Sequence, residues 1–501
     1  MAASPMDPRR SLVAAILGSS MAFLDSTVVN VALPVMQRGL GATVGQLQWV
    51  VEAYALMLSA LVLVGGALGD RLGRRRVFSV GVVLFAGASV VCGLAPRIDI
   101  LIGARALQGV GAALLVPGSL ALISAAYPPD RRGAAIGSWS AWSAVTAAAG
   151  PVAGGWVASH ASWRWIFFFN VPVAAVVVAL AGRIEETRDP DAPPRLDLAG
   201  AGLVTAGLGL VVYALIDANG GAATGPMGST KTVVLLLAGA GSLAAFGLVE
   251  ARRRSPMVPL SLFRSRTFAV TNVLTLLLYA GMGGAMFFIP FNLIQVQHYT
   301  PAAAGAALLP FVFFVSGMSR RVGALATKLG PRLFLAGGPL VAAAGFVLLA
   351  RPAIGGSYWS TFFPAIVVWG LGLGLTIAPL TTAVMGAVDP RHAGLASGIN
   401  NAVARAAGLL AVAALGALLV WWFNHGLDRA LAPLSLAPAV ARAADAQRSR
   451  LGGADFSAFA PALRGGLRAA FDTAYVAAFR VLMLACAGLA ALAAAAGLFV
   501  V

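Results

Sequence analysis

Long runs of apolar residues, separated by short polar segments, extend along the whole chain. A helix needs about 20 mostly apolar residues to cross the hydrocarbon core of a bilayer, which is about 30 Å thick. Fourteen runs meet this requirement, and we expect each to form a membrane-spanning helix. Their approximate ranges are 12–33, 47–69, 77–95, 98–123, 133–158, 164–182, 197–217, 231–249, 267–291, 302–319, 333–350, 359–386, 394–422 and 475–499.

The composition excludes a soluble protein. Of the 501 residues, 59% are hydrophobic and only 11% are charged, and the mean hydropathy is +0.87. A soluble domain carries about a quarter charged residues. The net charge of +17 could suggest nucleic-acid binding, but the arginines stand in short clusters between apolar runs. That distribution is typical of a membrane protein, so we expect an all-α polytopic membrane protein in a lipid bilayer and no nucleic-acid partner.

The arginines and lysines also predict the orientation. With the N-terminus inside, the expected cytoplasmic loops hold clusters such as residues 74–76 and 252–254, whereas short outer loops hold isolated residues such as Arg38 and Arg97. The positive-inside rule therefore places both termini in the cytoplasm. The long outer segment 423–474 carries six arginines, but long loops obey this rule poorly. We expect amphipathic helices at the outer surface in this segment.

The N-terminal apolar run predicts a membrane helix and not a cleavable signal. The run near 12–33 is too long for a signal peptide and continues into an array of spans. The bias toward Ala, Gly and Arg is typical of a GC-rich bacterial genome. We therefore expect a multi-pass protein of a bacterial inner (plasma) membrane.

Nothing in the sequence indicates a catalytic or metal centre. The two cysteines, Cys92 and Cys486, lie far apart inside apolar runs, so neither a disulfide framework nor a metal site is expected. The four histidines lie near the ends of spans, and no Walker loop or nucleophile–base pair is recognisable. We expect no enzymatic activity, no cofactor and no ATP-driven step in this chain.

The chain contains an internal repeat. Residues 66–75 align with residues 323–332 at an offset of 257, and Gly133 and Gly137 align with Gly394 and Gly398 at an offset of 261. Parallel repeats of six spans are typical of the two halves of many secondary transporters. This predicts a six-helix bundle over 1–190, an inserted two-helix hairpin with its linkers over 191–255, and a second bundle over 256–501.

A basic loop between the second and third spans reads GALGDRLGRRR over residues 66–76. It resembles the loop signature of the major facilitator superfamily, G-x-L-x-D-R-x-G-R-R, and matches it at Gly66, Leu68, Asp70, Arg71, Gly73, Arg74 and Arg75. One acid among four arginines can form a switchable ion-pair cluster, and the glycines permit a tight turn. The resemblance implies a gating role for this loop. The simpler interpretation is a basic loop that only orients the chain.

Three further motifs resemble the fourteen-span drug:proton antiporters of that superfamily. Residues 24–34 match the first-helix signature L-D-x-T-V-V-N-V-A-L-P, and residues 101–113 match the fourth-helix pattern L-x-x-x-R-x-x-Q-G-x-G-A-A. Residues 146–155 resemble the span-five motif G-x-x-x-G-P-x-x-G-G, with Thr146 in place of the first glycine. The motif residues present there are Gly150, Pro151, Gly154 and Gly155. In the family this cluster seals against leak and marks exporters.

Three charged residues are candidates for proton coupling. Asp25 and Glu52 are the two acids well inside expected spans, and Arg105 is the obvious basic partner. At ~1.5 Å per residue, all three lie about 8 to 12 Å below the outer ends of their spans. A charge inside a membrane helix is costly and is a functional candidate by default. Asp25, which belongs to the family signature, leads narrowly over Glu52 as proton carrier. The structural alternatives are a carboxylate bonded to local backbone or to Thr27 for Asp25, and a snorkelling or lipid-interface acid for Glu52.

The remaining candidates are polar and aromatic residues that could line a substrate cavity. Arg405 lies deep in its span without an acid in its own half, and it either caps carbonyl groups or meets an anionic substrate group. Aromatic residues of membrane helices more often face lipid or the core than a ligand. The candidates are Asn30, Gln108, Trp142, Phe288, Asn400 and Arg405.

The resemblance implies the major facilitator fold and the export of hydrophobic or amphipathic small molecules by alternating access, driven by a proton gradient. We expect a monomer whose partners are protons, the substrate and the bilayer. A proton-coupled uptake symporter of the same fold is the first alternative, and the Gly-Pro cluster of span five argues against it. A membrane enzyme or receptor without transport is the second alternative.

Overall fold

The computed structural model describes residues 8–189, 197–217, 230–253, 256, 258–389 and 393–500, and every regular element in these ranges is a helix. The all-α class expected from the sequence is therefore confirmed for this part of the chain. The helices of the first half are α1 (Pro8–Leu40), α2 (Val44–Leu72), α3 (Arg74–Leu94), α4 (Ile98–Ala126), α5 (Pro129–His160), α6 (Trp165–Phe168) and α7 (Asn170–Ala181).

The second half begins after two helices, α8 (Leu198–Asp217) and α9 (Thr230–Arg252). It continues with the 3-10 turn η1 (Leu260–Arg264), α10 (Arg266–Phe291), the π-helical turn η2 (Asn292–Val296), α11 (Pro301–Ala307), α12 (Leu309–Leu329), α13 (Pro331–Leu349), α14 (Phe362–Gly386) and α15 (Ala393–Leu431). The last elements are η4 (Ala432–Leu434), α16 (Pro438–Asp445), η5 (Arg448–Gly453) and α17 (Pro461–Gly497).

Helices occupy all fourteen ranges expected to span the membrane. In the described part of the chain, twelve helical stretches are long and apolar enough to cross a bilayer. Helix α5 is not among these twelve, and α6 and α7 together form a shorter apolar stretch over Trp165–Ala181. A polytopic helical protein is thus established, whereas the count of fourteen spans stays a prediction.

The chain forms two compact units. The first comprises Met1–Ala32, Trp49–Gly209 and Gly241–Pro259, and the second comprises Leu33–Gln48, Leu210–Ala240 and Leu260–Val501. The core of the first unit is built from fully buried side chains such as Phe78 and Phe85 of α3. In the second unit, Trp369 of α14 is fully buried, and its ring centroid lies 4.2 Å from that of Phe311. The domain boundaries expected from the sequence stay a prediction.

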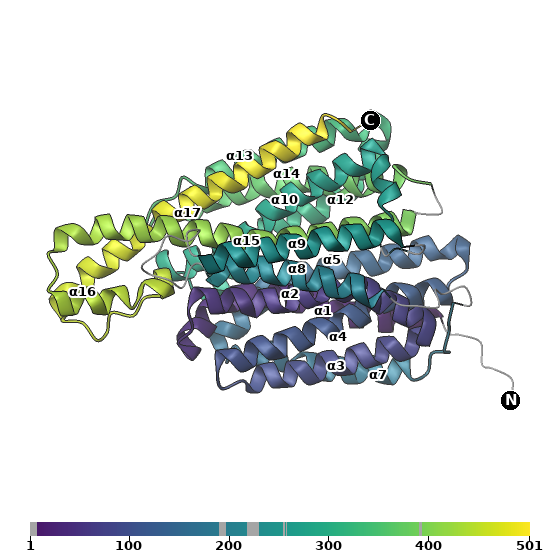
Figure 1. Ribbon diagram of the computed structural model, residues 1–501, viewed down its shortest axis with the longest axis horizontal. Coiled ribbons are helices and arrows are strands. Elements are labelled where there is room, and N and C mark those ends of the chain that lie inside the picture. The colour runs from purple at the N-terminus through teal and green to yellow at the C-terminus, as the bar shows by residue number, and fades with distance from the viewer. Residues whose placement is uncertain are drawn as a thin grey trace. The chain divides into compact units, whose positions relative to one another are not determined.

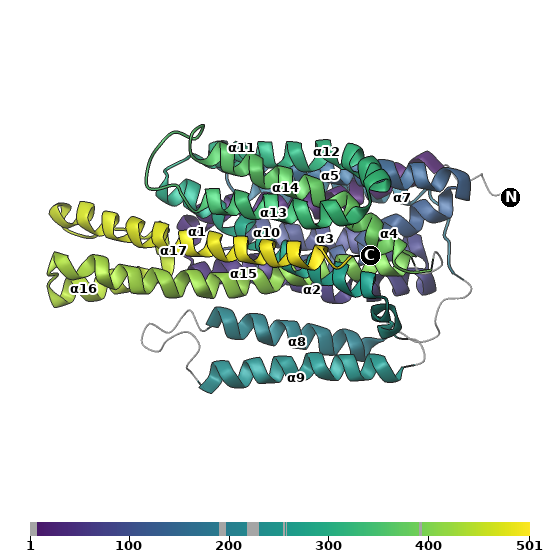
Figure 2. The ribbon, with the colours of Figure 1, turned by 90° about the horizontal axis from the view of Figure 1, so that it is seen from above.

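Helices α8 and α9 run side by side as a hairpin, in teal in Figure 2. Within the first unit, Arg253 pairs with Asp197 at 2.6 Å, and the Ser242 hydroxyl donates to the Leu203 carbonyl at 2.8 Å. Within the second unit, Lys231 pairs with Asp217 at 2.7 Å. Three polar contacts therefore join α8 and α9 or the residues that flank them, and the role of these helices as an inserted hairpin between two bundles stays a prediction.

The segment 423–474 is largely helical, as expected, but its helices are not all separate elements. Its first residues form the end of α15, which has 39 residues, and its last residues form the start of α17, which has 37. A bilayer core takes up only about 20 residues of a helix, so both helices are long enough to project from it. Figures 1 and 2 show α16 beside the ends of these two helices.

Close helix crossings confirm that the sequence repeat is also a structural repeat. A Cβ atom built on Gly81 of α3 would lie 2.9 Å from the carbonyl oxygen of Gly111 in α4. A Cβ on Gly338 of α13 would lie at the same 2.9 Å from the carbonyl oxygen of Gly372 in α14. The two pairs are offset by 257 and 261 residues (338 − 81 and 372 − 111), the offsets found in the sequence. Each half thus contains the same crossing of two helix backbones, which leaves no room for a side chain.

Replacing Gly111 by valine tests this crossing. A Cβ at this position lies 2.7 Å from the backbone nitrogen of Phe85, whereas a Cβ on Gly103 of the same helix meets nothing within 4 Å. We expect Gly111→Val to lower the free energy of unfolding by about 1–3 kcal/mol, and Gly103→Val to leave it nearly unchanged. Thermal denaturation of the purified variants in detergent measures both. Equal losses would show that the crossing is not the cause.

Candidate functional site

A buried ion pair lies inside the first unit. The Asp25 carboxylate of α1 accepts a hydrogen bond from Nη1 of Arg105 in α4, and each residue is only 1% exposed. Gln108, one helical turn beyond Arg105, donates from Nε2 to Asp25 Oδ1 at 2.9 Å. Its Oε1 accepts from Arg105 Nη1 at 2.6 Å. The three side chains therefore form one closed hydrogen-bonded triad.

The helices around this triad satisfy the remaining donors. Arg105 donates from Nε to the Val50 carbonyl of α2 at 2.9 Å, and its guanidinium lies 4.3 Å from the centroid of the Tyr54 ring. The Tyr54 hydroxyl donates to the Ala22 carbonyl at 3.2 Å. On the other side, Gln108 donates to the Ser89 hydroxyl of α3 at 2.9 Å. Because a buried charge is costly unless it is paired and hydrogen-bonded, this shell stabilises the pair.

Glu52 is not part of this arrangement. Val50 and Tyr54, one turn apart on α2, both contact Arg105. Glu52 is two residues from each, which is about 200° around the helix, so it lies on the opposite face of α2. It is 1% exposed, and its Oε2 has no hydrogen-bond partner among the described residues. The structure thus brings together two of the three candidate coupling residues, and the role of each stays a prediction.

The loop of residues 66–76 closes onto the segment that follows α7. Arg74 pairs with Asp70 at 2.8 Å and reaches Asp189 at 4.0 Å. Two backbone hydrogen bonds fix the contact, from Arg74 N–H to the Thr187 carbonyl at 2.9 Å and from Asp189 N–H to the Asp70 carbonyl at 3.0 Å. Gly66 and Arg71 lie on α2 before the turn. Of the four arginines of the loop, the structure shows Arg74 paired with Asp70 and near Asp189, and the gating role of the cluster stays a prediction.

Glu186 is a residue of this cluster that the sequence motif does not include. Its carboxylate accepts the backbone N–H groups of Arg75 at 3.0 Å and Arg76 at 3.2 Å, in the first turn of α3. The free N–H groups of a helix N-terminus favour an anion in this position. Gly73 has φ 121°, and a Cβ there would lie 2.6 Å from Glu186 Oε1. Its sequence signal is an acidic pair, Glu185 and Glu186, three and four residues after the expected span 164–182.

The glycines of the span-five motif lie against α1. A Cβ on Gly154 would lie 2.5 Å from the Val28 carbonyl oxygen, and a Cβ on Gly150 would collide with the Thr27 side chain. Pro151 and Gly155 are buried in the same helix. Thr146, which replaces the first glycine of the motif, forms a hydrogen bond of 3.0 Å with the Ser20 hydroxyl. The substitution therefore adds a polar link between α5 and α1.

The other candidate cavity residues belong to both units. In the first unit, the Asn30 Oδ1 atom is buried without a partner among the described residues, and Trp142 is 57% exposed on α5. In the second unit, Asn400 donates to Asn272 at 3.1 Å and to Thr275 at 2.7 Å. Arg405 is half-buried in α15 and has an interaction partner, and Phe288 is fully buried against Phe287. Their place in a substrate cavity stays a prediction.

A buried ion pair in a bundle of membrane-length helices, built as two parallel repeats, defines a secondary membrane transporter. The family model of the Major Facilitator Superfamily matches residues 15–412, so the chain belongs to that superfamily.

Curated relatives and solved structures agree with this assignment. The chain is 36% identical to the puromycin resistance protein pur8 of Streptomyces alboniger, over 85% of this chain and 86% of that protein. It is 36% identical to the multidrug resistance protein Stp of Mycobacterium tuberculosis, over 83% and 77%. A crystal structure of a bacterial homologue of the lysosomal transporter Spinster, inward-facing and unoccupied, matches with a TM-score of 0.66 at 18% identity, covering 98% of each chain. This last likeness concerns the fold alone.

Removing the Glu186 carboxylate tests its role at the start of α3. Glu186→Ala leaves two helix-terminal N–H groups without their acceptor, and we expect a loss of about 0.5–2 kcal/mol in the free energy of unfolding. The matched control is Glu185→Ala, because Glu185 is exposed and forms no hydrogen bond or ion pair with any described residue. Thermal denaturation compares the two variants. A control as destabilised as Glu186→Ala would contradict the capping role.

Proposed function

We propose that this protein exports hydrophobic or amphipathic small molecules, such as drugs, antibiotics or secreted metabolites, in exchange for protons. The relatives that support this are named for resistance to puromycin and to multiple drugs, and a third, 34% identical, is a tetracenomycin C resistance and export protein of Streptomyces glaucescens. The single structural observation that carries the coupling is the buried triad of Asp25, Arg105 and Gln108.

The proposed arrangement in the membrane has fourteen spans, with α5 and the α6–α7 stretch added to the twelve long apolar stretches. Both termini lie in the cytoplasm, and the protein acts as a monomer in the inner membrane of a bacterium. The orientation is supported by the distribution of arginines. In this arrangement the loop of residues 66–76 faces the cytoplasm, and the outer ends of α15 and α17 face the exterior.

In the proposed cycle, a proton and a substrate molecule bind alternately at the pair of Asp25 and Arg105. With Asp25 ionised, Arg105 is held by the carboxylate and by Gln108. A proton that reaches Asp25 from the outer side neutralises it and weakens its hold on Arg105. When the transporter is open to the cytoplasm, Asp25 releases its proton there, and substrate binding is then favoured. Substrate and proton are then bound in alternation, which is the condition for antiport.

A transport assay with everted membrane vesicles tests the function. We expect vesicles that contain the protein to accumulate ethidium or puromycin when a proton gradient is imposed, and to lose this accumulation after an ionophore collapses the gradient. Vesicles without the protein are the control. Accumulation that survives the ionophore would contradict proton coupling. If neither compound accumulates, and other amphipathic cations and the antibiotics of the relatives do not accumulate either, broad drug export is contradicted.

Two conservative variants decide which acid carries the proton. We expect Asp25→Asn to abolish gradient-driven accumulation, because the amide cannot release a proton, and Glu52→Gln to retain most of it. Loss of the charge partner of Arg105 also costs stability, about 3–5 kcal/mol by analogy with broken buried pairs. Binding of the substrate to the purified variant, measured at equilibrium, therefore serves as the folding control. Unchanged gradient-driven transport in Asp25→Asn, with a loss in Glu52→Gln, would move the role to Glu52.

A further inference from the structure

A polar cavity lies in the second unit, away from the residues of the triad. It has a volume of about 470 Å³ and is enclosed by the end of α1, by η2 with the turn that follows it, by η5 and by α17. All of its lining residues belong to that unit. Its volume falls in the range of about 300–1,000 Å³ that is usual for small-molecule sites. Its lining differs from that of most such sites because it is rich in charged and amide side chains.

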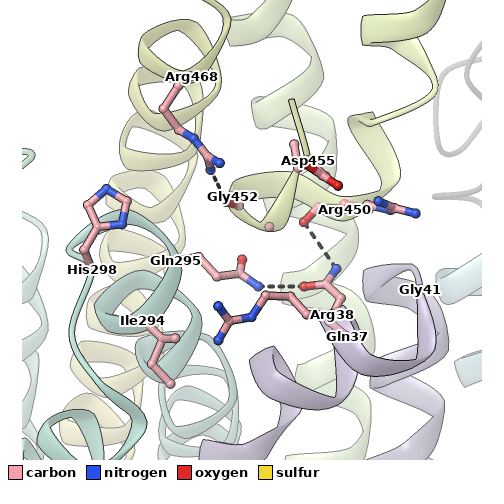
Figure 3. A pocket seen from close by; sticks show the side chains of 12 residues that line it. Gln37, Arg38, Gly41, Ile294, Gln295, His298, Arg450, Gly452, Asp455 and Arg468 are labelled. Carbon is pink, nitrogen blue, oxygen red and sulfur yellow. Dashed lines mark hydrogen bonds between the residues drawn. The ribbon is translucent and has the colours of Figure 1, made fainter. Parts of the chain in front are cut away.

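Four polar side chains from three elements face a common space in this cavity. Figure 3 shows the guanidinium groups of Arg38 and Arg468, the imidazole of His298 and the amide of Gln295 around it. Arg38 is exposed and forms no hydrogen bond or ion pair with any described residue. Arg468 donates from Nη1 to the Gly452 carbonyl at 3.2 Å. Each guanidinium has five N–H donors, so several donors of both arginines are available to a ligand.

The nearby carboxylates do not cancel this positive charge. Asp455 lines the cavity, but Figure 3 shows it turned to the other side together with the side chain of Arg450. The Ser457 backbone N–H donates to Asp455 at 2.9 Å, which lowers the pKa of that carboxyl. Asp472, one helical turn from Arg468 on α17, interacts electrostatically with Arg468 and His298. Asp455 also interacts with Arg468 and Arg450. Three lining arginines, Arg38, Arg450 and Arg468, therefore outnumber the two nearby carboxylates, and the space favours an anion.

A buried glutamine pair forms the floor of the cavity. Gln295 donates from Nε2 to Gln37 Oε1 at 2.6 Å, and Gln37 donates from Nε2 to the Arg450 carbonyl at 3.3 Å. The residues are 8% and 1% exposed. The Oε1 atom of Gln295 is buried and has no hydrogen-bond partner among the described residues. A buried acceptor of this kind requires a donor, so the ligand that suits the cavity carries a hydroxyl group beside its negative charge.

The loop that covers the floor is shaped to fit it. A Cβ on Gly453 would lie 2.7 Å from Gln37 Oε1 and 2.8 Å from Gln295 Nε2, so only glycine allows the loop to approach the pair this closely. Leu451 in the same turn has φ 53°, in the left-handed region that a leucine rarely adopts. Such strain persists only where the surrounding structure fixes it. The cavity is therefore a formed site rather than a gap between loose surface side chains.

We propose that this cavity binds a phosphate group that carries a hydroxyl donor. Arg38, Arg468 and His298 bind the anionic oxygens, and Gln295 Oε1 accepts a hydrogen bond from the hydroxyl group. Free hydrogen phosphate and the glycerophosphate headgroup of phosphatidylglycerol share this chemistry. In the proposed orientation the site opens to the exterior, at the level where α1 leaves the membrane. It is separate from the proton-coupling triad and goes beyond the proposed transport function.

The test is a binding measurement on the purified full-length protein and does not depend on transport. Its melting temperature is followed while sodium phosphate replaces sodium chloride at constant ionic strength, with sulfate as an anion without a hydroxyl donor. We expect phosphate to stabilise the wild type saturably and more strongly than sulfate. Arg38→Gln should weaken the apparent affinity for phosphate by about tenfold or more, since a hydrogen bond to a charged group is lost.

Arg442→Gln is the matched control, because Arg442 is an exposed arginine of α16 that does not line the cavity. It should bind phosphate like the wild type. The same variants in nanodiscs of phosphatidylglycerol and of phosphatidylcholine separate the two sources of phosphate. Stabilisation by phosphatidylglycerol that depends on Arg38 identifies the headgroup, and stabilisation by soluble phosphate alone identifies the free anion. If neither probe stabilises the protein, or if Arg38→Gln behaves like Arg442→Gln, the proposal is wrong. Equal stabilisation by sulfate would contradict the role of Gln295.

Discussion

The cost of placing a charge in a medium of low dielectric constant governs the first unit of this transporter. An isolated carboxylate at the position of Asp25 would be neutralised or expelled, because the penalty for burying an unpaired ion is several kcal/mol. Arg105 removes that penalty only where it lies within hydrogen-bonding distance of the Asp25 carboxylate. Gln108 donates a further hydrogen bond to that carboxylate and accepts one from Arg105. The pair therefore fixes the relative positions of α1 and α4. Through Val50 and Tyr54 it also fixes α2.

Helix α2 connects this pair to the loop cluster. Its N-terminal half supplies the Val50 carbonyl and the Tyr54 ring to Arg105, and its C-terminal end supplies Asp70 to Arg74. The helix is continuous between these points, so a rigid-body movement of α2 changes both sets of contacts together. Glu186 anchors the start of α3 next to Asp70. The buried pair at one end of the unit and the ion-pair cluster at the other thus contact the same continuous helix.

Much of this architecture could be predicted from the sequence because its causes are local or periodic. Apolar runs of about 20 residues produce helices wherever backbone groups have no water to bind, and helices occupy every expected range. The offsets of 257 and 261 residues place Gly81 with Gly111 and Gly338 with Gly372. The contact of Asp25 with Arg105 agrees with their similar depth and opposite charge. Glu52 lies at a similar depth, but its angular position on α2 places it on the opposite face of that helix. The depth of a residue in its span does not give this angle.

The sequence by itself determined the helical class, the repeat and the family motifs, since hydropathy and charge inside a membrane allow few alternatives. Only the tertiary structure decided that Asp25, and not Glu52, pairs with Arg105, and which further groups complete each site. Ser89 accepts a hydrogen bond from Gln108, Glu186 caps α3, and Gln37 meets Gln295, which is 258 residues away. These contacts join residues that no period or motif connects. The physical reason is that a hydrogen bond depends on atoms within about 3 Å, and the packing of whole helices sets that distance.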